Sequence, residues 1–160
     1  MKQWRVWVRG FLALLVLVAT VSGCTHGKFT VFEPLQCVPY ARDVSGIEIY
    51  GDAYTWWDKA PKEYSRGHKP RQGSVIVLSK TERLPYGHVA VVERVVSNRE
   101  IQVTHVNFGQ DYNSRRVVYH DMTAIDTSAK NDWSRVQFVM PNGGTSRIYP
   151  VSGFVYNTPH

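Results

Sequence analysis

Cys37 is the residue of this 160-residue chain most able to carry out chemistry. It is one of two cysteines and opens an expected helix, while His88 opens an apolar strand further along the chain. A thiol that has a histidine available elsewhere in the fold is typical of a cysteine nucleophile with its general base. The pattern therefore predicts catalysis by Cys37, provided that folding brings His88 beside it.

A second histidine and an asparagine lie on one face of a later expected strand. Side chains alternate along a strand, so residues of odd number between 101 and 107 share a face. They are Ile101, Val103, His105 and Asn107. The two apolar residues indicate that this face points inward, towards the helices. His88 begins the preceding strand, so a hairpin would bring the polar ends together, where buried polar groups serve as one another's partners.

The expected position of Cys37, in the first turn of a helix, favours nucleophilic attack. A helix N-terminus carries partial positive charge and free N–H groups, which stabilise a thiolate. A nearby histidine takes up the thiol proton, and the backbone N–H of Cys37 points at the oxyanion that forms on an attacked carbonyl. We expect Cys37 as the nucleophile and His88 as the base. Two candidates, His105 and Asn107, remain for the group that orients His88.

The same residues allow two other interpretations. Cys37, His88 and His105 form an acceptable zinc ligand set, but no close pair such as C-x-x-C or H-x-x-x-H accompanies them. In an exported protein, Cys37 could instead pair with Cys24 in a disulfide. A lipid on Cys24 would consume that sulfur and leave Cys37 without an intrachain partner.

The first 23 residues have the pattern of a bacterial signal peptide. Three basic residues precede an apolar run over 11–21, which is shorter than the ~20 residues of a membrane span. Small residues at 22 and 23 then precede Cys24, which resembles the lipidated cysteine of a lipobox. Secretion with cleavage nearby, or an uncleaved anchor helix, are the alternatives. Thr25 rather than Asp follows the cysteine, so we expect an extracytoplasmic lipoprotein on the periplasmic face of the outer membrane.

Composition narrows the class of partner. The formal charge of +6 includes three positive charges in the leader, so the mature chain is mildly basic. This charge suits a partner with acidic groups, whereas the scattered lysines and arginines predict no nucleic-acid surface. We expect a tether over 24–34, one catalytic domain over 35–140 and a C-terminal extension over 141–160. Nothing in the pattern bears on oligomeric state.

Hydrophobic periodicity predicts an α+β fold, with N-terminal helices packed on one face of an antiparallel sheet. We expect helices over 36–45, with Gly46 as the C-cap, and over 52–59, ending before Pro61. A loop follows over 59–73. The turn at 97–99 predicts a hairpin. Strands are expected over 74–78, 87–96, 100–108, 116–120 and 136–140.

Five segments, in order, resemble the CHAP domain (cysteine, histidine-dependent amidohydrolase/peptidase), a family of papain-like peptidoglycan hydrolases. The resemblance covers roughly residues 35–110. The segments are Gln36-Cys37, Gly51-Asp52-Ala53 with Trp56-Trp57, Gly73-Ser74-Val75-Ile76-Val77, Gly87-His88-Val89-Ala90-Val91-Val92 and His105-Val106-Asn107-Phe108.

The resemblance implies a papain-like fold in which Cys37 is the nucleophile and His88 the base, with no metal or cofactor. The family often carries an acidic residue where His105 stands, and this chain has no carboxylate there. A related branch uses a second histidine, so His105 is favoured as the orienting group, and Asn107 is retained as its neighbour in the site.

The implied activity is cleavage of amide bonds in peptidoglycan, as an amidase or endopeptidase, by an enzyme held at the envelope through Cys24. Gln36, Trp56 and Trp57 are the expected substrate-binding residues, although the tryptophans suit the core better and at most one would line a groove. The alternative is a non-catalytic lipoprotein that binds the cell wall or acts as a scaffold on the same fold.

Overall fold

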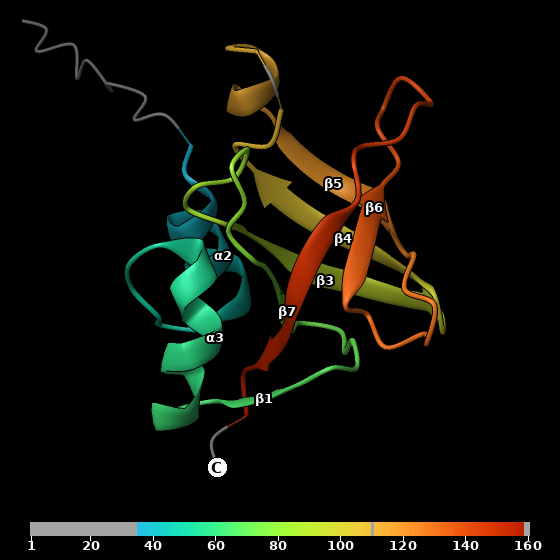
Figure 1. Ribbon diagram of the computed structural model, residues 1–160. Coiled ribbons are helices and arrows are strands. Elements are labelled where there is room, and N and C mark those ends of the chain that lie inside the picture. Colours follow the sequence, from blue (N-terminus) through green and yellow to red (C-terminus); the bar gives the residue numbers. More distant parts are fainter. Residues whose placement is uncertain (1–34, 110, 159–160) are drawn as a thin grey trace, which may run out of the picture. The chain divides into compact units, whose positions relative to one another are not determined.

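A computed structural model describes residues 35–109 and 111–158 (Figure 1). Its regular structure is mostly β, with a few short helices, and the sheet is antiparallel throughout. The helices are α2 (Cys37–Ser45) and α3 (Trp56–Lys59), with 3-10 turns η1 (Ala53–Thr55), η2 (Ala60–Lys62) and η3 (Ser114–Arg116). The strands are β1 (Ser65–Gly67), β2 (Val75–Leu78), β3 (His88–Ser97), β4 (Glu100–Val106), β5 (Val118–Asp126), β6 (Arg135–Phe138) and β7 (Tyr149–Tyr156).

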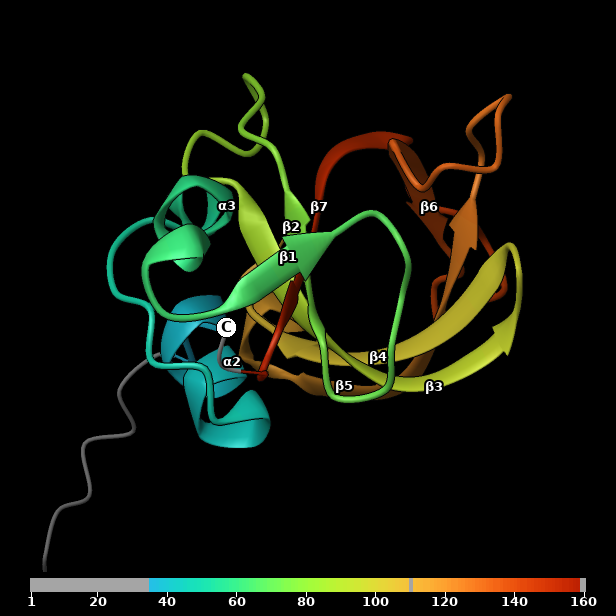
Figure 2. The same cartoon turned by 90° about the horizontal axis from the view of Figure 1, so that it is seen from below.

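The sheet closes on itself through β7. The strand order is β1-β7-β2-β3-β4-β5-β6, and β7 also pairs with β6. On one edge β7 meets β2, and on the other its first residues meet β6 and its last residues meet β1. Figure 2 shows the long strands curving round towards β6 and β7. The six strands β2 to β7 therefore form an antiparallel barrel, because β7 pairs with both β2 and β6 and closes the sheet.

The closed sheet has one apolar cluster inside it and another between its outer face and the helices. The interior cluster contains Ala90, Val92 and Phe138, together with Ile101 and Val103. The outer cluster joins residues of β2, β3 and β7 to the helical segments, which lie together on one side of the sheet (Figure 1). It contains Ala41, Ile47, Ile49, Ala53, Trp56, Ala60, Val75, Val77, Val89, Val91 and Val155.

This arrangement corrects the expected direction of the His105 face. The prediction of helices on an antiparallel sheet is confirmed, and the face that carries Ile101, Val103 and His105 is buried. It points into the barrel, however, and not towards the helices, which cover the Val89 and Val91 face. The cause is closure, since a sheet that curls round packs its inner face against itself.

Helix α2 matches its predicted residue range to within one residue, and Gly46 is its C-cap as expected. Gly46 is in the left-handed conformation (φ 69°) and its N–H bonds to the carbonyl of Arg42. The Tyr40 hydroxyl lies 2.6 Å from Thr104 Oγ1, which ties α2 to the outer face of β4. The second helical segment is broken into η1, α3 and η2, and Pro61 lies in the first turn of η2 rather than beyond the helix.

Three strands differ from their predictions. β1 lies within 59–73, the stretch expected as a loop, β5 runs to Asp126 rather than to residue 120, and β7 lies in the stretch expected as a C-terminal extension. Pro150 and Gly153 interrupt the β-branched pattern of β7, so periodicity does not reveal it. Because β7 pairs with three strands, this stretch contributes to the same sheet as the rest of the domain.

The predicted signal peptide and tether, with Cys24, lie outside the described residues. Within the residues that the structure describes, no helix is long and apolar enough to cross a membrane.

Candidate active site

Cys37, His88 and Asn107 line one open cleft with a volume of about 1280 Å³. Its walls come from the start of α2, residues 51–53, the loop before β3, residues that follow β4 and the segment between β6 and β7. Folding brings these five segments to the same rim, although most of them are far apart in the chain. Three of the four residues expected to share a site therefore line one cavity, whereas His105 is not among its lining residues.

Cys37 is the first residue of α2 and is a half-buried, free cysteine. Burial raises the pKa of its thiol, and the opposing N–H groups of Val89, Val38 and Cys37 itself do not outweigh burial. The N–H groups at the helix N-terminus thus favour a thiolate as expected, but burial, which the sequence did not reveal, has the larger effect on the pKa. The contact with the Val89 amide places the sulfur against the start of β3, one residue after His88.

His88 is the first residue of β3 and is 2% exposed. Its Nε2 lies 2.8 Å from Nδ1 of His105, which is itself fully buried at the end of β4. Burial lowers the pKa of His88 to about 3 and lowers the pKa of His105 as well. Both imidazoles are therefore neutral at pH 7, and each needs its hydrogen-bond partner because burial leaves it little or no access to solvent.

The side chain of Asn107 contacts groups other than His88. It follows β4 with a positive φ of 57°, which asparagine tolerates better than most residues. Its Nδ2 donates to Gln36 Oε1 (3.1 Å), and its Oδ1 accepts from Nε of Arg115 (3.0 Å). Asn107 thus connects Gln36 to Arg115, whereas His105 is the residue that contacts His88.

The two tryptophans lie away from the cleft. Trp56 is completely buried in the outer cluster beneath the helices. Trp57 is partly buried, with the guanidinium of Arg66 over its ring at 4.4 Å and the His68 ring 5.1 Å away. Neither indole is among the residues that line the cavity, whereas Gln36 is.

Three arginines line the cleft, and sequence reasoning singled out none of them. Arg83 and Arg147 come from two loops that meet near Tyr149, where both oppose the rise that burial causes in the pKa of that phenol. Arg115 is the third. Scattered in the sequence, these residues read as ordinary surface charges, and only the closed barrel brings them together. Asp52 is the one acidic residue among those lining this cavity.

The zinc interpretation finds no support in the side-chain arrangement. Among residues 35–109 and 111–158, no group of three or more His, Cys, Asp or Glu side chains is placed to hold a metal ion. His105 instead uses Nδ1 for His88 and directs Nε2 at Met122 Sδ, 3.0 Å away.

The part of the chain that contains Cys37 and His88 is similar to known proteins. Residues 27–107 match the family model described as CHAP domain. Staphylococcal secretory antigen ssaA2 of Staphylococcus aureus is 34% identical over 92 residues, which cover 55% of this chain and 33% of that protein. Staphylococcal secretory antigen SsaA of Staphylococcus epidermidis is 36% identical over 94 residues, covering 56% and 35%. The chain thus spans about a third of the length of these relatives.

Proposed function

The chain belongs to the CHAP domain family, and from this premise we propose that it is a cysteine amidohydrolase that cleaves amide bonds in bacterial peptidoglycan. The observation that carries the proposal is the buried His88–His105 pair opening onto the cleft that also contains Cys37. A nucleophile, a base and a partner for the base are the three parts that this chemistry requires.

In the proposed reaction, the Cys37 thiol attacks the amide carbonyl while His88 accepts its proton. The thiol and imidazole are both neutral at rest, so the proton moves as the carbon–sulfur bond forms. The backbone N–H of Cys37 stabilises the oxyanion. His88 then returns the proton to the leaving amine, and the carbon–nitrogen bond breaks. Water, deprotonated by His88, hydrolyses the thioester and regenerates the thiol.

The charge of the cleft supports a substrate that carries carboxylates. Arginine pairs with planar carboxylates through two parallel hydrogen bonds. Arg83 and Arg147 line the cleft with their side chains exposed, and Arg115 adds a third positive charge. Stem peptides of peptidoglycan combine amide bonds with free carboxylates, so they fit both the chemistry and the charge.

We propose that the protein acts outside the cytoplasm and is anchored by a lipid on Cys24, on the periplasmic face of the outer membrane. The relatives are named as secretory antigens, and the leader of this chain has the pattern of a lipoprotein signal. A lipid anchor would hold the enzyme beside an insoluble substrate.

Hydrolysis can be tested by incubating purified cell wall with the protein and with its Cys37→Ala variant. We expect the wild type to release soluble fragments and the variant to release none above background. His68→Ala is the matched control, because this histidine is exposed beside Trp57, does not line the cleft and should not affect release. Mass spectrometry of the fragments identifies the bond that is cut. Equal release by wild type and Cys37→Ala would refute the proposal.

A second candidate is a wall-binding or scaffold lipoprotein without turnover. It is favoured by the raised pKa of Cys37 together with the lowered pKa of His88, because both oppose a preformed thiolate–imidazolium pair. In the same experiment, retained wall binding with no release by either protein would support this candidate.

A further inference from the structure

His105 lies between His88 and Met122, and the three side chains form a chain of contacts that starts at the cleft. Nε2 of His88 is 2.8 Å from Nδ1 of His105, and Nε2 of His105 is 3.0 Å from Sδ of Met122. Met122 is 5% exposed and does not line the cleft. Its sulfur therefore contacts the second histidine and not the cleft.

The chemistry of a thioether determines where the protons of this chain lie. Methionine sulfur can accept a hydrogen bond but has no proton to donate. Nε2 of His105 must therefore carry the proton in this contact, and in the neutral imidazole Nδ1 is then an acceptor. Nδ1 of His105 in turn requires a proton on Nε2 of His88. The remaining nitrogen, Nδ1 of His88, keeps its lone pair.

We propose that Met122 is a positioning residue which, through His105, holds His88 in the tautomer that can act as a base. The inference rests on the proposed function, since it assigns the state of the residue that would deprotonate Cys37. With the protons reversed, the two rings could occupy the same positions, but Nδ1 of His88 would carry a proton and could accept none.

The surroundings of His105 offer no other group that would fix this choice. Its ring packs against the rings of Phe108, Tyr119 and Phe138. The titratable groups that face it are His88 and Tyr119, and the Tyr119 hydroxyl donates to the carbonyl of Ser114. The sulfur of Met122 is thus the one acceptor that the described residues place at Nε2 of His105.

A bulge in β5 directs Met122 into the barrel. Val103 pairs with Met122 and His105 with Tyr119, so β5 uses three steps where β4 uses two. Without the extra residue, Tyr119 and Met122 would point to opposite faces, and a bulge is the usual way to redirect a side chain. The bulge places both on the His105 side, where Tyr119 packs on the His105 ring and Met122 meets Nε2.

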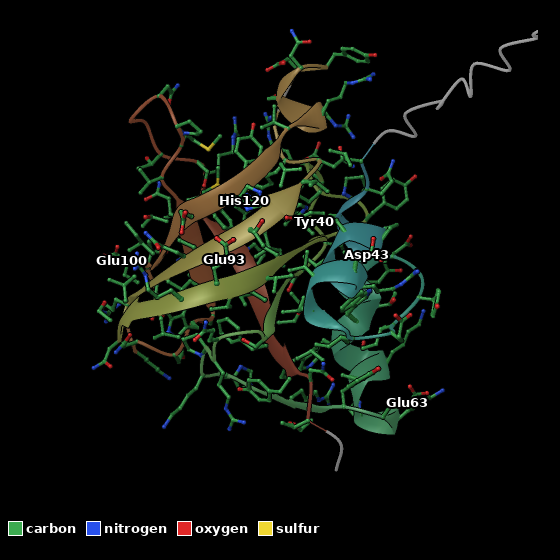
Figure 3. The ribbon with its side chains drawn as sticks, turned by 180° about the vertical axis from the view of Figure 1, so that it is seen from behind. Tyr40, Asp43, Glu63, Glu93, Glu100 and His120 are labelled. Carbon is green, nitrogen blue, oxygen red and sulfur yellow. The ribbon has the colours of Figure 1, made fainter. Side chains whose placement is uncertain are left out.

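Glu93 holds this bulge from outside the barrel. Asp121 has a positive φ of 51°, and its N–H donates to Glu93 Oε2 at 2.7 Å. The other carboxylate oxygen lies 3.4 Å from Nδ1 of His120. Figure 3 shows Glu93 and His120 on the outer face of the sheet. The position of Met122 therefore has its own support, separate from the cleft.

The test is the tautomer of each histidine, measured by ¹⁵N NMR on the full chain labelled at histidine, above pH 7.5. In the wild type we expect both buried histidines to be protonated at Nε2 alone. Met122→Leu keeps the volume and removes the acceptor, so part of the population should shift to Nδ1–H on His88. The kcat of wall hydrolysis should fall on the order of three- to tenfold with KM unchanged, as for loss of one hydrogen bond.

Two further variants separate this role from a structural one. Met122→Gln restores an acceptor of similar length and should recover the wild-type tautomers and most of the rate. Ile101→Val removes one methylene from the same interior cluster, so it should lower stability comparably and leave the tautomers unchanged. Wild-type tautomers and kcat in Met122→Leu would overturn the proposal.

The spectra need no turnover, so the two proposals can fail separately. Nε2–H tautomers that depend on Met122, in a protein that releases no wall fragments, would uphold the role of Met122 and refute only the hydrolase. Active protein in which His88 carries its proton on Nδ1 would refute only the role of Met122.

Discussion

Burial at Cys37 and His88 changes the two pKa values in opposite directions. Desolvation disfavours whichever form is charged, so the pKa of the thiol rises and that of the imidazole falls. Each shift favours a neutral pair over a thiolate–imidazolium pair. In the proposed reaction, the proton of Cys37 would therefore move to His88 only as the carbonyl is attacked.

The buried histidines should make the protein sensitive to acid. The pKa of His88 is about 3 in the folded protein, against an ordinary value of 6.5. Between these values the unfolded chain binds a proton that the folded protein does not. The contribution of His88 to the stability of the folded protein is therefore complete above pH 6.5 and is lost as the pH falls towards 3. The free energy of unfolding should fall by about 1.4 kcal/mol per pH unit for this group alone.

Urea unfolding between pH 6.5 and 4.5 measures this slope before most carboxylates titrate. We expect His88→Gln to flatten the slope by about 1.4 kcal/mol per pH unit. Ile101→Val is the control, since it removes buried volume without changing a titratable group, so the slope should not change. An unchanged slope in His88→Gln would show that His88 is protonated in the folded protein.

At the scale of elements, Gly87 determines how closely β3 begins against its neighbours. It has a positive φ of 67°, and a Cβ there would lie 2.7 Å from both the Leu78 carbonyl oxygen and the Tyr54 amide nitrogen. The tight approach of η1, β2 and β3 at this point positions His88, the next residue. A larger residue would have to separate backbone from backbone, which cannot yield as a side chain can.

Gly87→Ala should therefore reduce both stability and activity. We expect a loss of roughly 1–3 kcal/mol from overpacking, in addition to about 1–2 kcal/mol for the positive φ. Gly73→Ala is the matched control, because Gly73 has a φ of 78° and open space around it, so only the φ cost applies. Urea unfolding and release of wall fragments measure the two effects. Equal losses in both variants would mean that the close approach at Gly87 is unimportant.

Figure 1 shows the relation between elements that brings the site together, with the helices beside the strands whose ends carry the histidines. α2 is attached to the sheet at two points. Tyr40 contacts Thr104, and Asn157, which follows β7, donates from Nδ2 to the Ser45 carbonyl. The position of Cys37 at the start of α2 therefore depends on β4 and on the residue that follows β7. β7 is as necessary to the site as β3, although it contributes no expected catalytic residue.

For the whole molecule, the proposed location of the protein beside the cell wall depends on the predicted lipid anchor. Full-length protein expressed in bacteria should fractionate with membranes and incorporate labelled palmitate. Cys24→Ser should appear in the soluble extracytoplasmic fraction without the label, because its oxygen cannot form the thioether. Cys37→Ser is the control and should remain membrane-bound. A Cys24→Ser protein that still sediments with membranes would indicate an uncleaved anchor helix.

The sequence by itself determined the local features of this protein. The apolar and β-branched runs predicted five of the seven strands, although β5 proved longer, and the end signals predicted α2 to within one residue. The motif around Cys37 and His88 indicated the CHAP family, which the match over 27–107 confirms. The limits of the strands and of α2 depend on residues close together in the chain, where periodicity and caps act directly.

Only the tertiary structure decided how those pieces complete a site. Because β7 closes the sheet, the His105 face points into the barrel. His105 rather than Asn107 contacts His88, and three arginines lie together at the cleft. The bulge that brings Met122 to His105 depends on a carboxylate from β3. Each of these outcomes arises from contacts between residues far apart in the chain, and no local pattern records which distant strands will pair.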